Sequence, residues 1–248
     1  MKISVITVCY QSARTLERSL QSVAEQDWPT VEHIAIDGAS TDGTREILER
    51  FRSRLACVIS EPDNGIYDAM NKGLAHASGD IVCFLNADDR YASANVFSLV
   101  VSLMQENKLD ALIGDVGFFH QGDSSRMVRR YRSDRFHPGR LAWGWMPAHP
   151  ALFLRKDVVQ RIGQFKTDYR IAGDFEFIVR AFHGHALRYR HIPDVLVHMQ
   201  TGGVSTAGWR AKIRLNQEVL RACRENGLQT NMLKILSKYP AKLLELLH

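Results

Sequence analysis

Residues 81–90, IVCFLNADDR, pass directly from an apolar run to an amide and two adjacent carboxylates. The β-branched and aromatic residues of the first half predict a buried strand over 81–85. At its exit stand Asn86, Asp88 and Asp89, although neighbouring carboxylates repel each other and an isolated buried carboxylate is costly. The stretch therefore predicts a strand that ends either in a solvated turn capping the next helix or in a metal site.

The alternation of a short strand with a short helix extends over the first hundred residues. Strands are predicted over 3–9, 31–36, 55–60 and 81–85, and helices from Ser12, from Thr41 or Asp42, and over 66–77. Such alternation implies a mostly parallel sheet, whose ligands bind at the carboxyl ends of the strands. Acidic residues follow three of these strands at Asp37, Asp63 and Asp88. We interpret this acidic edge of the sheet as a functional site.

The second part of the chain is less regular. It contains a predicted hairpin over 111–119 and 126–131, helices over 156–162, 174–183 and 209–226, and a strand over 192–199. In the tail, over 232–247, lysines recur at every fourth residue against apolar positions. That pattern is typical of an interfacial amphipathic helix, and equally of a C-terminal packing helix or a dimer helix.

The composition is that of an ordinary globular chain, with 45% hydrophobic and 24% charged residues among 248. The formal charge of +5 suits a phosphate-bearing ligand, an anionic membrane or nucleic acid without choosing among them. Four widely spaced cysteines without a C-x-x-C pair indicate neither zinc nor a disulfide framework. No apolar run reaches about 18 residues, and the N-terminal run is too short for a signal peptide. We therefore expect a cytoplasmic protein that does not cross a membrane.

Four segments together carry a resemblance to a known family. They are ISVITVCYQSARTLERSLQSV (3–23), IDGASTDGT (36–44), EPDNGIYDAMNKGLAHASGDIVCFLNADD (61–89) and AGDFEFIVRAF (172–182). In order and spacing they resemble the family 2 glycosyltransferases. The 61–73 segment and GGVS (202–205) look most like bacterial members that build exopolysaccharide or O-antigen.

The resemblance implies a GT-A fold, an α/β architecture with a Rossmann-like, mostly parallel central sheet and flanking helices. It places the GT-A domain over 1–205, with a nucleotide-binding half over 1–90 and an acceptor-binding half over 91–205. Residues 206–248 then form a C-terminal helical extension. The implied activity is inverting transfer of a hexosyl or N-acetylhexosaminyl group from a nucleotide-diphosphate sugar, with Mn²⁺ or Mg²⁺ as cofactor.

Matching positions in the motifs give a set of expected nucleotide-binding residues. They are Val8, Tyr10, Asp37, Asp68, Lys72, Asn86 and Ala87. Asp37 resembles the carboxylate that accepts a hydrogen bond from the nucleobase, for which a uracil N–H is a suitable donor. Tyr10 is equally well a core aromatic, and Asp68 and Lys72, four residues apart, are equally well an ion pair.

The metal is assigned to Asp88, because Asn86-Ala87-Asp88 matches the Asp-x-Asp motif of the family. Asn replaces the first carboxylate, so the site has one charge fewer and metal affinity without nucleotide should be weak. Hard cations take oxygen ligands and need only one or two protein carboxylates when phosphate and water supply the rest. His198 is a second candidate ligand, although a lone histidine in an apolar setting is more often structural.

Asp174 of the Gly-Asp-Phe-Glu segment matches the catalytic base of the family, which takes the proton of the acceptor hydroxyl. A role near the acceptor or in support of the site is expected for His149 and Arg180. Gly202 and Gly203 belong to a glycine segment that could cover the diphosphate.

The expected partners are a UDP-sugar or another nucleotide-diphosphate sugar, and a glycan or lipid-linked acceptor in cell-surface polysaccharide synthesis. A cluster of arginines over 126–140 and the amphipathic tail fit contact with the inner face of an anionic membrane, and a homo-oligomer stays open. Two rival interpretations are a nucleotide-binding or nucleotidyl-transferring protein without glycosyl transfer and a basic nucleic-acid-binding module. The acidic edge would repel nucleic acid, and no G-x-G-x-x-G or G-x-x-x-x-G-K motif is present.

Overall fold

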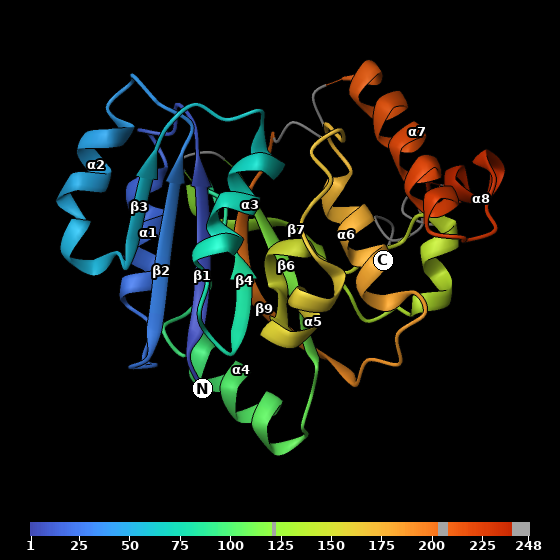
Figure 1. The fold of residues 1–248 in the computed structure, drawn as a ribbon, viewed down its shortest axis with the longest axis horizontal. Helices are drawn as coiled ribbons and strands as arrows, with labels where there is room; N and C mark the ends of the chain where they lie inside the picture. Colours follow the sequence, from blue (N-terminus) through green and yellow to red (C-terminus); the bar gives the residue numbers. More distant parts are fainter. Residues whose placement is uncertain (121–122, 203–207, 240–248) are drawn as a thin grey trace.

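The computed structural model describes residues 1–120, 123–202 and 208–239. Within these ranges nine strands form one sheet in the order β3-β2-β1-β4-β8-β6-β9-β5, with β7 paired to β6. The strands are β1 (Ile3–Cys9), β2 (Val31–Asp37), β3 (Cys57–Ser60), β4 (Ile81–Phe84), β5 (Arg90–Tyr91), β6 (Ala111–His120), β7 (Asp123–Tyr131), β8 (Leu152–Arg155) and β9 (Tyr189–Gln200). Helices flank the sheet, as Figure 1 shows.

The helices are α1 (Leu16–Ala24), α2 (Thr44–Arg50), α3 (Ile66–His76), α4 (Val96–Glu106), α5 (Lys156–Ile162), α6 (Gly173–Phe182), α7 (Trp209–Glu225) and α8 (Met232–Leu236). Three short 3-10 helices, η1 (Arg52–Arg54), η2 (Pro138–Trp143) and η3 (His149–Ala151), lie in the connections. In Figure 1, α2 lies at one end of the molecule and α7 and α8 at the other.

Strands β1 to β4 are parallel to one another, because each returns through a helix that crosses the sheet. Alternate residues of β1 reach opposite faces. Ile6 and Val8 pack in the cluster that includes α3, α5, α6 and α7. Val5 packs in a second cluster with α4, and Cys9 in a third with α1 and α2. Coverage of both faces explains why the strands are continuously apolar.

The two halves of the sheet meet at β8, which pairs antiparallel with both β4 and β6. Beyond it, β6 and β9 are parallel, whereas β7 and β5 add antiparallel partners. The predicted hairpin is present as β6 and β7. The mostly parallel sheet with flanking helices is therefore confirmed, with β8 as the antiparallel strand that joins its halves.

Candidate active site

The polar residues that follow the parallel strands lie at one edge of the sheet. Cys9 pairs with Asp37, and Asp37 with Ser60, so the ends of β1, β2 and β3 are in register. Ile6 pairs with Phe84, which brings the end of β4 beside them. The parallel register thus gathers the loops after all four strands, as expected from the sequence.

Asp37 does not have the position expected of a residue that contacts a nucleobase. Its carboxylate is fully buried and accepts hydrogen bonds from Ser40 N at 3.1 Å, from Ser40 Oγ and from Ser60 Oγ at 2.7 Å. These donors belong to the β2 loop and to β3. These hydrogen bonds stabilise the loop after β2. The Asp37 oxygens are buried and already accept hydrogen bonds, so they are not accessible to a ligand.

A different carboxylate, Asp63, lies beside Tyr10 at the surface of this edge. A Cβ atom added to Gly38 would lie 2.6 Å from Asp63 Oδ2 and 3.2 Å from Tyr10 Cδ2. Tyr10 is 65% exposed, which excludes the core interpretation of this residue, whereas Val8 is buried in the core beneath it. Asp63 Oδ1 accepts a hydrogen bond from Gly65 N at 2.8 Å, which fixes the side chain in the turn.

Asp68 and Lys72 hold the turn that precedes α3. Lys72 Nζ lies 2.8 Å from Glu61 Oε1 and donates a hydrogen bond to Pro62 O at 2.8 Å, while Asp68 Oδ2 is 3.9 Å away. Asp68 Oδ2 also accepts a hydrogen bond from Asn64 N at 3.0 Å. The geometry therefore matches the ion-pair alternative, with the Lys72 ammonium engaged by Glu61 and not directed freely at a nucleotide.

The loop after β4 contains two carboxylates in different surroundings. Asp88 is exposed, whereas Asp89 is 1% exposed, and its Oδ1 has no hydrogen-bond partner among the described residues. Asp89 Oδ2 accepts a hydrogen bond from Asn86 Nδ2 at 3.3 Å. Ala87, which lies between these residues in the sequence, is buried. Burial raises the pKa of Asp89 well above its usual value, and the neighbouring charge of Asp88 adds to the rise. Desolvation also raises the pKa of Asp88.

A cleft opens beside these carboxylates, and its wall includes His198 on β9. Arg90 pairs with His198 across β5 and β9, and the wall also includes Arg18 of α1. His198 Nδ1 is buried and has no hydrogen-bond partner among the described residues. Burial, followed by the charge of Arg90, lowers the pKa of His198 to about 4, so the ring is neutral near pH 7. The sheet therefore brings Asp88 and His198 to one cleft.

Sequence reasoning did not single out the two arginines of this cleft. Arg18 and Arg90 carry no motif of their own, and only the pairing of β5 with β9 and the position of α1 bring them together. Their charges stand where a diphosphate beside Asp88 would need balancing.

The cleft fits a divalent cation only if a ligand completes the site. Among residues 1–120, 123–202 and 208–239, no three His, Cys, Asp or Glu side chains come together in a group that could hold a metal. The unpartnered oxygen of Asp89 and nitrogen of His198 nevertheless supply acceptor atoms next to the exposed Asp88. Such a partial donor set suits Mg²⁺ or Mn²⁺ held jointly with phosphate oxygens and water.

Asp174 lies in the first turn of α6 and is half-buried. Its Oδ1 accepts a hydrogen bond from Phe175 N at 2.8 Å. Desolvation raises the pKa of Asp174 to about 6, a rise that this hydrogen bond partly offsets. Tyr67, at the start of α3, donates a hydrogen bond from its hydroxyl to Ile171 O at 2.7 Å, which brings α6 next to the turn after β3. A carboxylate with a pKa near neutrality is suited to general-base catalysis.

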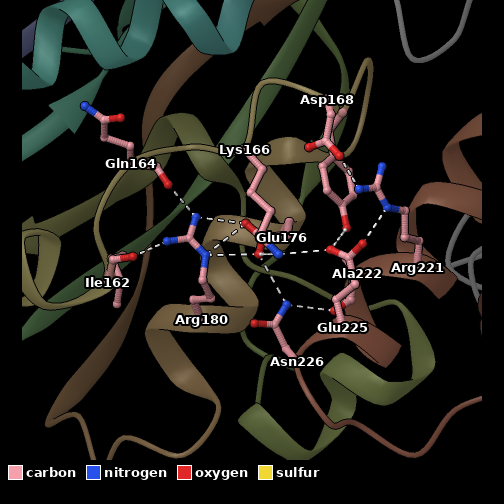
Figure 2. A network of polar contacts seen from close by, with 11 residues as sticks. Ile162, Gln164, Lys166, Asp168, Glu176, Arg180, Arg221, Ala222, Glu225 and Asn226 are labelled. Atoms are coloured by element: carbon pink, nitrogen blue, oxygen red, sulfur yellow. Dashed lines mark hydrogen bonds and ion pairs between the residues drawn. The ribbon is translucent and has the colours of Figure 1, made fainter.

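Arg180 and His149, the two residues expected to support the site, lie in different surroundings. Arg180 binds Glu176 through Nε at 2.9 Å and Nη2 at 2.8 Å, and also the carbonyls of Ile162 and Gln164, as Figure 2 shows. Arg180 thus braces the loop before α6.

His149 is buried, with its ring centroid 5.3 Å from that of Phe84, and burial lowers its pKa to about 4. It therefore has the surroundings of a core histidine. Gly202 follows β9 with a φ of 106°, a left-handed conformation that favours glycine. Gly203 and most of the glycine segment lie outside the described residues.

Three arginines of the 126–140 cluster contact other residues of the protein. Arg130 binds the buried Asp115 at 2.7 Å, and Arg132 lies 2.6 Å from Asp134. The guanidinium of Arg129 lies 5.0 Å from the centroid of the Phe118 ring. The carboxylates of Asp115 and Asp134 thus offset part of the positive charge of this segment.

The architecture matches that of solved glycosyltransferase structures. Staphylococcus aureus TarS 1–349 in complex with UDP-GlcNAc superposes with a TM-score of 0.71 over 92% of this chain and 68% of that one, at 20% identity. The mannosyltransferase PcManGT from Pyrobaculum calidifontis, in complex with GDP-Man and Mn²⁺, gives 0.64 over 90% of this chain and 63% of that one, at 23% identity. Against a longer TarS chain, this chain spans 43% of the length. The fold is the GT-A fold of glycosyltransferases.

The sequence agrees with this class. The model of glycosyl transferase family 2 matches residues 4–171. An uncharacterized glycosyltransferase of Mycobacterium tuberculosis is 34% identical over 72% of this chain and 68% of its own length. A PGL/p-HBAD biosynthesis glycosyltransferase of Mycobacterium bovis is 31% identical over 82% of this chain and 78% of its own length. The chain belongs to glycosyltransferase family 2.

Proposed function

We propose that this protein transfers a hexosyl or N-acetylhexosaminyl group from a UDP-sugar to a hydroxyl of a glycan or lipid-linked acceptor, with inversion. The observation that carries the proposal is the presence of two carboxylates in different surroundings, one in the cleft after β4 and one in the first turn of α6. Asp88 is exposed in a cleft with Arg18, Arg90 and His198, whereas Asp174 is half-buried, with its pKa raised to about 6. One carboxylate suits the diphosphate side of a transfer reaction and the other suits the acceptor side.

For the nucleobase we propose Asp63 and Tyr10 in place of Asp37. Tyr10 offers an exposed aromatic face on which a base can stack, and Asp63 Oδ2 lies at the edge of the same surface beside Gly38. A carboxylate oxygen accepts hydrogen bonds, which suits the ring N–H of uracil. The absence of a side chain at Gly38 leaves room for the Asp63 carboxylate at this position.

For the diphosphate we propose a cation held by Asp88 together with phosphate oxygens, with His198 as a further ligand and Arg18 and Arg90 balancing charge. When bound, Mn²⁺ or Mg²⁺ stabilises the negative charge that develops on the departing diphosphate. The PcManGT complex contains Mn²⁺, which supports this choice. Because the first position of the motif is Asn86, we expect cation binding to depend on nucleotide.

In the proposed reaction the acceptor oxygen attacks the anomeric carbon from the face opposite the diphosphate. A bond forms between that oxygen and the anomeric carbon, and the bond from the anomeric carbon to the diphosphate oxygen breaks. The nucleoside diphosphate leaves with the electron pair of the broken bond, and the acceptor proton passes to Asp174. A single displacement of this kind inverts the anomeric centre and requires no covalent enzyme intermediate.

The acceptor is proposed to be carried at an anionic membrane surface in cell-envelope glycan synthesis. A relative named for PGL/p-HBAD biosynthesis supports this class. Trp143, Leu233 and Leu236 are exposed near α8, with Lys234 Nζ 5.6 Å from the Trp143 ring centroid. Ile235, by contrast, is buried, so α8 also packs on the protein, whereas residues 240–247 of the tail lie outside the described residues. Among the described residues no helix is long and apolar enough to cross a bilayer.

Release of nucleoside diphosphate from a panel of nucleotide sugars tests this function. We expect wild-type turnover of a UDP-sugar to rise with pH through about 6 and then level off, since Asp174 must be ionised to accept the proton. Asp174→Asn should lower kcat by roughly 10²–10⁴-fold and leave nucleotide affinity nearly unchanged. Unchanged kcat in this variant, or binding of UDP without turnover of any sugar nucleotide, would contradict the proposal.

A further inference from the structure

One face of α7 lies against the loop that leads into α6. Glu218, Arg221 and Glu225 are spaced three and four residues apart, so they share a side of this helix. Each contacts the loop of residues 163–172, which directly precedes Gly173 and Asp174. Helix α7, which lies beyond the matched family region, thus touches the loop that leads to the proposed base.

Glu218 binds the last three residues of that loop through their backbone amides. Its Oε1 accepts a hydrogen bond from Arg170 N at 3.1 Å, and its Oε2 accepts hydrogen bonds from Ile171 N and Ala172 N, both at 2.8 Å. Ala172 is the N-cap of α6. Ala172 has no side chain that could cap the helix, and an anion at a helix N-terminus is favourable. Glu218 adds a carboxylate from another helix to Asp174 and Glu176, which lie in the first turn of α6 itself.

The earlier part of the loop is held by Arg221 and Glu225, which lie on the same face in the C-terminal half of α7. Glu225 Oε2 accepts hydrogen bonds from Lys166 Nζ and Tyr169 Oη, both at 2.9 Å, and Arg221 pairs with Asp168. Lys166 Nζ also lies 3.0 Å from Glu176, and Figure 2 shows these contacts of Lys166, Arg221 and Glu225. The loop is therefore anchored to α7 at both ends.

On its other side the loop contacts α3 of the nucleotide-binding half. The Tyr67 hydroxyl donates to Ile171 O, and a Cβ added to Gly173 would lie 2.7 Å from the Tyr67 ring. Residues 171–173 are thus held between Tyr67 and Glu218. Displacement of either side chain would move the first turn of α6, and with it Asp174.

We propose that Glu218 is a positioning residue for the transfer reaction. By binding the amides of residues 170–172 it fixes the first turn of α6 and holds the Asp174 carboxylate in place to receive the acceptor proton. This inference rests on the proposed function of Asp174. It makes α7 a working part of the active site, although the family model ends at residue 171.

Three variants test this role. Glu218→Ala removes the acceptor oxygens, Glu218→Gln retains one acceptor without charge, and Gln217→Ala is the matched control because Gln217 is exposed on the same helix. Hydrogen exchange of amides 170–172 gives a readout that needs no activity. Nucleotide-sugar turnover gives kcat and the donor KM.

We expect faster exchange of these amides in Glu218→Ala, with a kcat about 100-fold lower and a donor KM within about twofold of wild type, since misplacing a catalytic group by about 1 Å costs that much. Glu218→Gln should recover part of both effects, and Gln217→Ala should match wild type. If Glu218→Ala does not fold, the same comparison is made with Glu218→Gln.

Faster exchange with an unchanged kcat would overturn the positioning role and leave the proposed function intact. Unchanged exchange would overturn the contact itself. Absence of turnover in the wild-type protein would instead overturn the proposed function, and with it the role of Glu218, whatever the exchange rates show.

Discussion

Two aspartates at the edge of the sheet show how position decides the role of a carboxylate. Asp37 ends β2, is fully buried and has hydrogen bonds from Ser40 and Ser60. Asp63 is half-buried in the next loop, with one oxygen facing Gly38. Both are aspartates that follow a strand, and the resemblance selected Asp37 as the nucleobase contact. Burial separates a structural carboxylate from one that can meet a ligand.

This difference predicts opposite outcomes for two alanine variants. Asp63→Ala should weaken UDP binding about tenfold with little change in stability, because it removes an acceptor at the proposed base site. Asp37→Ala should lower the free energy of unfolding by about 1–3 kcal/mol, since it leaves buried donors unpaired. Calorimetric titration with UDP and chemical denaturation measure the two effects. If Asp37→Ala is stable and loses UDP while Asp63→Ala binds normally, our assignment of the base contact is wrong.

At the end of β4 the sequence predicts which residue belongs to the candidate metal site, but not how deeply each carboxylate is buried. The match to the Asp-x-Asp motif selects Asp88, and the structure places it in a cleft with His198. That Asp89 is buried with an unpartnered oxygen depends on packing around the loop, which local sequence does not encode. Arg18 and Arg90 were missed for the same reason.

Among the elements, the apolar runs of β1 to β4 and the helices between them were predictable because both faces of the parallel strands are buried. The hairpin of β6 and β7, and α5, α6 and α7, also follow their predicted ranges closely. Neither α4 nor β8 was predicted. The apolar pattern of β8 follows a proline-containing aromatic segment, and its place between β4 and β6 is a long-range pairing. Such pairings depend on tertiary structure.

The contact of α3 with β1 gives a prediction for this element. A Cβ added to Gly73 would lie 2.3 Å from Ile6 Cγ2. Gly73→Ala should therefore lower the free energy of unfolding by about 1–3 kcal/mol through overpacking, although alanine favours helix by about 1 kcal/mol. Denaturant titration measures the change. The exposed His76→Ala in the same helix should stay within about 0.5 kcal/mol of wild type. Gly73→Ala with increased stability would show that α3 does not pack this closely on β1.

On the scale of the whole molecule, α7 is integrated with the rest of the protein. Val219, Ala222 and Cys223 lie in the same core cluster as β1, α3 and α6. The resemblance placed residues 206–248 in a C-terminal extension, because it assigned the GT-A domain to residues 1–205. Their contact with the loop before Asp174 arises only when α6 and α7 pack together.

The sequence predicts the candidate site in outline. The parallel register guarantees that the loops after β1 to β4 share an edge, and the resemblance assigns Asp88 and Asp174 to that site. The identity of the base contact, the engagement of Lys72 by Glu61 and the role of α7 depend on side-chain geometry, which motif positions do not specify.

The most direct test of the account is thermal unfolding with UDP, GDP and dTDP, each with and without Mn²⁺, for wild type and Asp88→Asn. A ligand that binds only the folded state at about 100 times its Kd adds about 2.7 kcal/mol, which corresponds to roughly 5–10 °C for a chain of this size. We predict that UDP raises Tm the most, that Mn²⁺ increases the shift, and that Asp88→Asn loses the Mn²⁺-dependent part alone. If no nucleoside diphosphate raises Tm while single-stranded nucleic acid does, the acidic edge is not a nucleotide-sugar site and the account is contradicted.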